Sequence, residues 1–312
     1  MSRHGRGLAG LAFLAGLLCA TTAQAFSLQF CDRPHEPSAG QRDVMLRFGA
    51  VVRDEIAASA SPAALIARSG LDLHRLDVRY SHAAVVLKDN ADRPWSVREL
   101  YFSCDEHRPR VYDEGLTGFL LGTDDPDTGY VSLVFLPPEH AESLRGTAVD
   151  KQHALGVLGA SYSANAYPFS TRHQNCNQWV IELLADAWAT GDIDASGPDA
   201  DARTRAQAWL RGQGYLPTVF TVGAHAMTWL PALVPWLSND DHPPHELAHN
   251  RYNVSMPSSI ETFVQARVAG ARRVEICHVG RRVVLHRGWD DIADGCMPAP
   301  GDRVVELTPE QD

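Results

Sequence analysis

One cysteine lies at the beginning of a segment with helical periodicity. Residues 174–180 read Gln-Asn-Cys-Asn-Gln-Trp-Val, and apolar residues then recur at helical spacing as far as Trp188. Asn175 is a favourable N-cap, and Gln178 three residues later completes a pattern close to a capping box. Cys176 therefore lies in the first turn of a predicted helix, where unpaired backbone N–H groups and the positive end of the helix dipole favour a thiolate. The simpler interpretation is a small buried residue at a helix start.

A histidine upstream of this segment offers a base for the cysteine. Residues 79–88 read Arg-Tyr-Ser-His-Ala-Ala-Val-Val-Leu-Lys, which predicts a buried strand with His82 near its beginning. A strand histidine and a helix-start cysteine are the pair that a papain-like thiol hydrolase requires, because the imidazole activates the thiol. The next predicted strand, residues 95–102, carries Glu99, the best-placed group to orient the imidazole. A carboxylate on an exposed strand face is the competing interpretation of Glu99.

These residues together predict acyl transfer through a covalent intermediate. A thiolate at Cys176, with His82 as the base, would attack an amide or ester carbonyl and form an acyl-enzyme, which water or a second nucleophile then resolves. The backbone N–H of Cys176 would stabilise the oxyanion. Tyr80 and Gln174 are two further candidate donors, although residues of these types more often serve in packing or capping. This chemistry requires no cofactor, and we predict none.

The order of the two segments, with the histidine strand before the cysteine helix, is the reverse of papain's. It resembles the circularly permuted NlpC-type papain-like proteins, which include the lecithin:retinol acyltransferase-like enzymes. Residues 79–82 and 174–179 resemble more narrowly the bacterial family known as domain of unknown function 2145. Three further stretches support this resemblance: 65–70, 240–243 and 255–261. The resemblance extends over about residues 31–268.

The resemblance implies an α+β fold of the papain-like, permuted NlpC type, in which an antiparallel sheet packs against helices. It also implies the pair of Cys176 and His82, together with a third position that varies among His, Glu, Gln and Asn and that Glu99 would fill. Exported proteins with such folds include cell-wall peptide hydrolases and lipid-acting amidases and acyltransferases. We therefore expect a small peptide, a cell-wall component or a lipid-like molecule as substrate, and the resemblance does not choose among them.

The first 25 residues predict a cleaved signal peptide. A positively charged beginning precedes an apolar run over residues 8–20, and residues 23–25 read Ala-Gln-Ala, a small-x-small cleavage site. The mature chain would begin at Phe26. We therefore expect a periplasmic or secreted protein.

Beyond the signal peptide, we expect a papain-like domain over residues 26–270. A small C-terminal β-hairpin extension would follow over residues 271–312, with strands at 274–279 and 282–286. The acidic loop 124–129 lacks the ligand spacing of an EF-hand, which favours a solvated turn. Hydrophobic periodicity predicts further helices at 39–58, 147–158, 202–211 and 258–268, and further strands at 64–68 and 130–136.

Charge and hydropathy exclude some classes of partner. The formal net charge is −10 and there is no basic run, which argues against nucleic acid and anionic membrane surfaces as partners. Residues 219–237 carry no formal charge and are numerous enough to span a bilayer, but two prolines and a histidine interrupt them. We expect loops and short helices there, with a membrane-seeking surface as the alternative, and no transmembrane helix in the mature chain. The oligomeric state is not predicted.

The cysteines indicate an oxidising compartment. Cys277 and Cys296 are close in sequence across a turn-rich segment, so we pair them, and Cys31 and Cys104 then pair by elimination. Cys176 remains as the free thiol, and an unpaired cysteine in an exported protein is a candidate reactive group. Four bridged cysteines allow three connectivities, so this pairing is one of three.

Two other functions remain open. His245-Glu246-Leu247-Ala248-His249 matches the H-E-x-x-H pattern of zinc metalloproteases. The setting is poor, because two prolines immediately precede the motif and no third histidine follows at the usual spacing. We therefore predict no metal site and treat zinc catalysis as an alternative. A papain-like fold that serves as a non-catalytic binding module is the other alternative.

Overall fold

The computed structural model describes residues 37–71, 73–90, 94–189, 200–222, 234 and 236–308. The predicted signal peptide lies outside the described residues, so its cleavage remains a prediction. The described residues, from Pro37 onward, belong to one compact unit. Most of the uncharged stretch 219–237 also lies outside the described residues. No helix that the structure describes is both long and apolar enough to cross a membrane.

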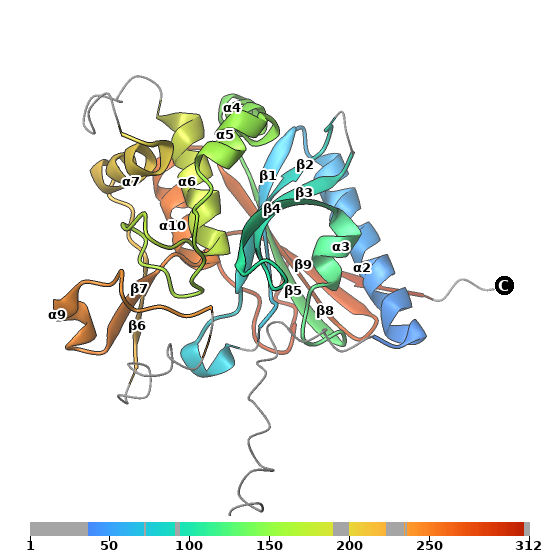
Figure 1. Ribbon diagram of the computed structural model, residues 1–312. Coiled ribbons are helices and arrows are strands. Elements are labelled where there is room, and N and C mark those ends of the chain that lie inside the picture. Colours follow the sequence, from blue (N-terminus) through green and yellow to red (C-terminus); the bar gives the residue numbers. More distant parts are fainter. Residues whose placement is uncertain are drawn as a thin grey trace, which may run out of the picture. The chain divides into compact units, whose positions relative to one another are not determined.

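The fold combines helices with one large sheet and one small sheet (Figure 1). The helices are α2 (Ala39–Ala58), α3 (Leu116–Leu121), α4 (Pro138–Val149), α5 (Lys151–Gly156), α6 (Cys176–Trp188), α7 (Ala202–Gly212), α9 (Pro244–Leu247), α10 (Pro257–Arg267) and the 3-10 turn η1 (His74–Leu76). The strands are β1 (Ala63–Arg68), β2 (His82–Leu87), β3 (Ser96–Ser103), β4 (Arg108–Gly115), β5 (Thr128–Phe135), β6 (Thr218–Thr221), β7 (Arg251–Val254), β8 (Arg272–Val279), β9 (Arg282–Arg287) and β10 (Arg303–Glu306).

The large sheet has eight strands in the order β10-β9-β8-β5-β1-β2-β3-β4, and every neighbouring pair is antiparallel. Its two central strands are β5 and β1, and β1 also pairs with β2, where Arg68 lies opposite His82. The hairpin predicted near the C-terminus is present as β8 and β9. All eight residues of β8 pair with β5, so this hairpin is part of the central sheet. The expectation of an α+β fold with an antiparallel sheet is confirmed.

Helices cover both faces of the sheet. α2 and α3 lie on one face, where Ile66, Ala84 and Val86 join them in one hydrophobic cluster. On the other face α6 packs against β2 and β3, and α4 packs against α6 and β1 (Figure 1). The alternate residues of β2, Ala83 and Val85, are therefore buried as well. Burial on both faces explains why β1 and β2 are continuous apolar runs in the sequence.

The small sheet pairs β6 with β7 beside α9. Tyr252, Val254 and Met256 form a second hydrophobic cluster there, and Leu73 and Val78 pack against it. These last two residues flank η1 and are bridged to each other as an isolated antiparallel pair. The loop between β1 and β2 is therefore held by the small sheet.

The prediction of one continuous helix over residues 147–158 is wrong. The chain forms two helices, α4 and α5, that meet at Asp150. Asp150 ends α4 and acts as the N-cap of α5, where its carboxylate accepts hydrogen bonds from the N–H groups of Gln152 and His153. A short acidic side chain that satisfies backbone donors favours a helix start over a helix interior.

The cysteines behave largely as expected. Cys277 and Cys296 form a disulfide, which confirms that pairing. Cys176 is free and buried, which is also confirmed. Cys104 is disulfide-bonded, but its predicted partner Cys31 lies outside the described residues, so that pairing stays a prediction.

Candidate functional site

His82 is the first residue of β2, and its imidazole is enclosed by aromatic rings. The ring centroid lies 5.6 Å from that of Tyr101 on β3 and 5.8 Å from that of Phe119 on α3. Only 6% of His82 is exposed. The position at the end of the strand places the imidazole at the edge of the apolar core that α2 and α3 cover. These rings restrict the orientation of the imidazole.

Glu99 lies on β3 beside His82, as predicted, and it is buried rather than on an exposed strand face. Its carboxylate accepts a hydrogen bond from Nε2 of His82. Burial alone would raise the pKa of Glu99, but the charge and hydrogen bond of His82, with a contribution from Arg68, lower it overall. The carboxylate is therefore held ionised, in the state that can orient the imidazole.

Cys176 opens α6, and its side chain interacts with His82. Asn175 is the N-cap of this helix, because its side-chain oxygen accepts a hydrogen bond of 2.7 Å from the N–H of Gln178. Burial alone would lower the pKa of His82. The charge and hydrogen bond of Cys176, together with those of Glu99, outweigh it and raise the pKa to about 9. The imidazole therefore contacts both the thiol and the carboxylate, and its protonated form is favoured.

Asn177 ties the cysteine helix to the histidine strand. Its side-chain oxygen accepts a hydrogen bond of 2.8 Å from the N–H of Ala83, and its Nδ2 donates to the carbonyl of Ser81 at 3.2 Å. These two partners flank His82, and Asn177 follows Cys176. One buried amide thus fixes the spacing of the two reacting groups. We did not predict this role, although a polar residue in an otherwise apolar helix start is a signal for it.

The two further oxyanion donors that we proposed from the sequence are occupied elsewhere. The amide nitrogen of Gln174 donates to Val157 O and to Glu182, and its oxygen accepts from the N–H of Gly159. The hydroxyl of Tyr80 donates to Glu275. Both side chains are therefore committed to buried structural contacts.

Tyr162 takes a position that the sequence did not reveal. Its side chain forms a hydrogen bond with Cys176, and burial with the nearby Cys176 charge raises its pKa well above the usual value. The phenol therefore keeps its proton and can donate it in a hydrogen bond. Its ring packs on Phe102 with centroids 5.2 Å apart, and its backbone is bridged to Gln174. No local pattern in the sequence around this residue marks a contact with the cysteine.

The zinc-protease motif lies in and just after a single helical turn. The preceding proline and the first three residues of the motif make up α9, which is only four residues long, and its N-cap is Pro243. The Nδ1 of His249 donates to the carbonyl of His245 at 2.7 Å. Within the described ranges, no group of three His, Cys, Asp or Glu side chains gathers in a way that could hold a metal ion.

The comparison with known families agrees with the sequence resemblance. The model of an uncharacterised protein family conserved in bacteria, domain of unknown function 2145, matches residues 55–264, more than half of the chain. The chain belongs to this family. The matched range contains His82, Glu99 and Cys176, so the whole candidate site lies in the region that defines domain of unknown function 2145. No curated protein and no solved structure matches the chain.

Proposed function

We propose that the protein is an exported, papain-like cysteine hydrolase or acyltransferase that acts on an amide or ester bond of a small peptide, cell-wall or lipid-like substrate. The observation that carries this proposal is the imidazole of His82, which contacts both the free thiol of Cys176 and the buried carboxylate of Glu99. A nucleophile, a base and a group that orients the base are the three parts that thiol-based acyl transfer needs.

The proposed reaction has two steps. In the resting pair the proton of Cys176 resides on His82, and the thiolate attacks the carbonyl carbon to give a tetrahedral oxyanion. When this intermediate collapses, the imidazolium donates its proton to the leaving amine or alcohol, and a thioester remains on the cysteine. Water or a second nucleophile then loses a proton to His82 and attacks the thioester, which restores the thiolate–imidazolium pair. Glu99 stabilises the imidazolium whenever it forms and orients the ring when it is neutral.

We infer two donors for the oxyanion. The N–H of Cys176 lies in the first turn of α6, where backbone N–H groups have no partner within the helix. The hydroxyl of Tyr162 supplies the second donor, because it contacts the sulfur that attacks the carbonyl and keeps its proton. We therefore assign to Tyr162 the role of oxyanion donor for which the sequence had suggested Gln174.

The proposal predicts that the protein cleaves activated esters. With 4-nitrophenyl acetate and butyrate, the wild-type protein should release 4-nitrophenolate and carry an acyl group on Cys176 in intact-mass spectra. Cys176→Ser and His82→Ala should each lower the rate by about 100-fold or more. The exposed His153 provides the control, since His153→Ala should leave the rate unchanged. If the wild-type protein shows neither release of 4-nitrophenolate nor an acyl adduct, the enzyme proposal is rejected and the binding module remains.

Tyr162→Phe should separate acyl transfer from simple thiol reactivity. We expect the rate of ester cleavage to fall by roughly 10- to 100-fold, because one oxyanion donor is lost. Alkylation by iodoacetamide should change much less, since attack on its methylene carbon develops no oxyanion. Tyr112→Phe, on the outer strand β4, is the matched control. An equal fall in both reactions would show that Tyr162 acts only on the thiol or on the fold.

A further inference from the structure

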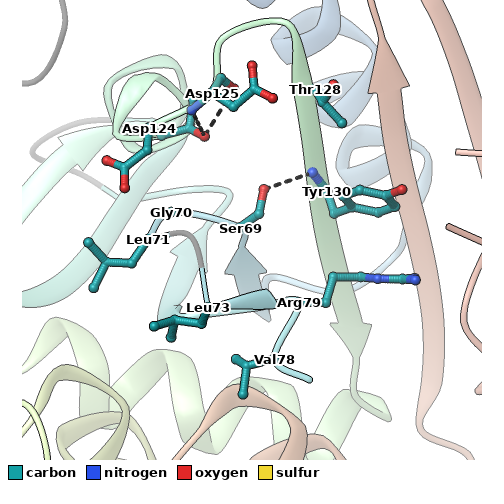
Figure 2. A pocket seen from close by; sticks show the side chains of 11 residues that line it. Ser69, Gly70, Leu71, Leu73, Val78, Arg79, Asp124, Asp125, Thr128 and Tyr130 are labelled. Atoms are coloured by element: carbon teal, nitrogen blue, oxygen red, sulfur yellow. Dashed lines mark hydrogen bonds between the residues drawn. The ribbon is translucent and has the colours of Figure 1, made fainter. Parts of the chain in front are cut away.

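A pocket of about 370 Å³ lies between the loop after β1 and the loop before β5 (Figure 2). This volume is at the small end of the range for ligand sites. Figure 2 shows Leu71, Leu73 and Val78 on one side of the pocket and the acidic loop with Asp124 and Asp125 on the opposite side. The pocket is therefore apolar on one wall and acidic on the other.

The pocket adjoins the histidine strand. The N–H of Leu71 donates a hydrogen bond of 3.0 Å to the hydroxyl of Ser81, the residue before His82. Gly70 also lies close to Ser81. A Cβ added at Gly70 would stand 2.9 Å from the Ser81 hydroxyl, so a larger residue at position 70 would displace this hydroxyl. The carbonyl of Ser81 in turn accepts the hydrogen bond from Asn177. A group held in the pocket thus lies next to the segment that carries the base.

The acidic wall of the pocket interacts electrostatically with a residue that contacts His82. Burial raises the pKa of Tyr101, and the negative charge of Asp124 contributes to raising it. Tyr101 is the ring that packs edge-on against His82. The charge at the pocket therefore acts within reach of the residues around the imidazole.

The side chains that line the pocket carry two negative charges and one positive charge, and the buried guanidinium of Arg68 lies beside Gly70. Arg79 also lines the pocket, but its guanidinium is bound to Glu275 at 2.9 Å and Asp294 at 2.8 Å. Among the described residues, no hydrogen bond or ion pair engages the carboxylate of Asp124. In the part of the chain that the structure describes, the side-chain carboxylate of Asp125 accepts one hydrogen bond, from the N–H of Asp127. An anionic ligand would be repelled here, whereas a cation would gain Coulomb energy.

We propose that this pocket is a substrate subsite for a primary ammonium group attached to a branched or short apolar chain. The ammonium would face Asp124 and Asp125, and the apolar chain would pack on Leu71, Leu73 and Val78, where burial of apolar surface favours binding. This chemistry is shared by the free amino-terminal residue of a short peptide and by an alkylamine. The role as a substrate subsite rests on the proposed function, but binding itself does not need the thiol.

Binding can be measured by NMR on the ¹⁵N-labelled mature chain carrying Cys176→Ser, which cannot turn over a substrate. L-leucinamide and 3-methylbutylamine carry the ammonium, and 4-methylpentanamide lacks it. At pH 7 the two ammonium probes should shift the amide signals of residues 123–128 and bind at least tenfold more tightly than the neutral probe. Tighter binding of L-leucinamide than of 3-methylbutylamine would assign the site to an amino-terminal residue, and equal binding would assign it to an alkylamine.

Variants of the acidic wall test whether Asp124 and Asp125 cause the difference in affinity between the ammonium probes and the neutral probe. Asp124→Asn combined with Asp125→Asn should reduce binding of the ammonium probes to the level of the neutral probe. Asp105→Asn, an exposed aspartate outside the pocket, should leave all three affinities unchanged. Equal binding of charged and neutral probes, or shifts confined to other residues, would overturn the proposal. An inactive enzyme that still binds the ammonium probes would keep the subsite and reject only the catalytic proposal.

Discussion

At pH 6 the wild-type protein should react with iodoacetamide at Cys176 about 100-fold faster than the His82→Ala variant. An ordinary cysteine, with a pKa of about 8.5, is thiolate to only about 0.3% at this pH. The protonated imidazole of His82 and the start of α6 both favour the negative sulfur. Removal of the imidazole should therefore return the thiol to nearly ordinary behaviour.

The pH dependence distinguishes this effect from a change in access. At pH 9 an ordinary thiol ionises without help, so the difference between the two proteins should shrink to a few-fold. Glu99→Gln should have a smaller effect in the same direction, because Glu99 acts on the sulfur only through the imidazole. If the wild type reacts at pH 6 like a simple thiol, and both variants leave the rate unchanged, Cys176 is a structural residue.

The second large effect concerns a buried ion pair that joins the cysteine helix α6 to α7. Glu182 of α6 is fully buried, and its carboxylate is bound by Arg203 of α7 at 2.8 Å and by the side chains of three glutamines. Arg203→Met should lower the free energy of unfolding by about 3–5 kcal/mol at pH 7, measured by urea denaturation, because a buried carboxylate loses its positive partner. Burial already raises the pKa of Glu182, and Arg203 only partly offsets this.

Two comparisons test that interpretation. The loss in Arg203→Met should be smaller at pH 5 than at pH 7, because a protonated Glu182 needs no positive partner. Arg145→Met removes a surface pair with Glu142 on α4 and should lower the free energy of unfolding far less, because solvent screens an exposed pair. Equal and small losses in both variants would show that the buried pair does not hold α6 in place.

The parts of the fold that local patterns specify could be predicted from the sequence. The helix over residues 39–58 has its capping box at Ser38 and Gln41, whose side chains and backbone exchange both hydrogen bonds. The N-cap at Asn175 is present, and the strand that carries His82 begins at that residue. These features depend on residues within one or two turns of each other, so hydrophobic spacing and capping chemistry are sufficient to place them.

Other elements depend on distant partners that the sequence does not indicate. β4 has charged and largely exposed residues because it lies at the edge of the sheet, so it lacks the apolar alternation of a half-buried strand. The hairpin of β8 and β9 was predicted as an extension, but its partner β5 is far away in the chain. Contacts of Asn177 and Tyr162 with the site likewise follow from how α6 and its preceding loop pack on the sheet.

The most direct test of the central claim is the titration of His82 by NMR in the wild type and in Cys176→Ala. The thiolate and Glu99 should hold the imidazole protonated at pH 7, and it should lose its proton as the pH rises through about 9. Without the sulfur, burial opposes the charge with only Glu99 to offset it, so the pKa of His82 should fall clearly in the variant. A wild-type His82 that titrates at or below the ordinary value of about 6.5, and is unaffected by Cys176→Ala, would contradict a thiolate–imidazolium pair.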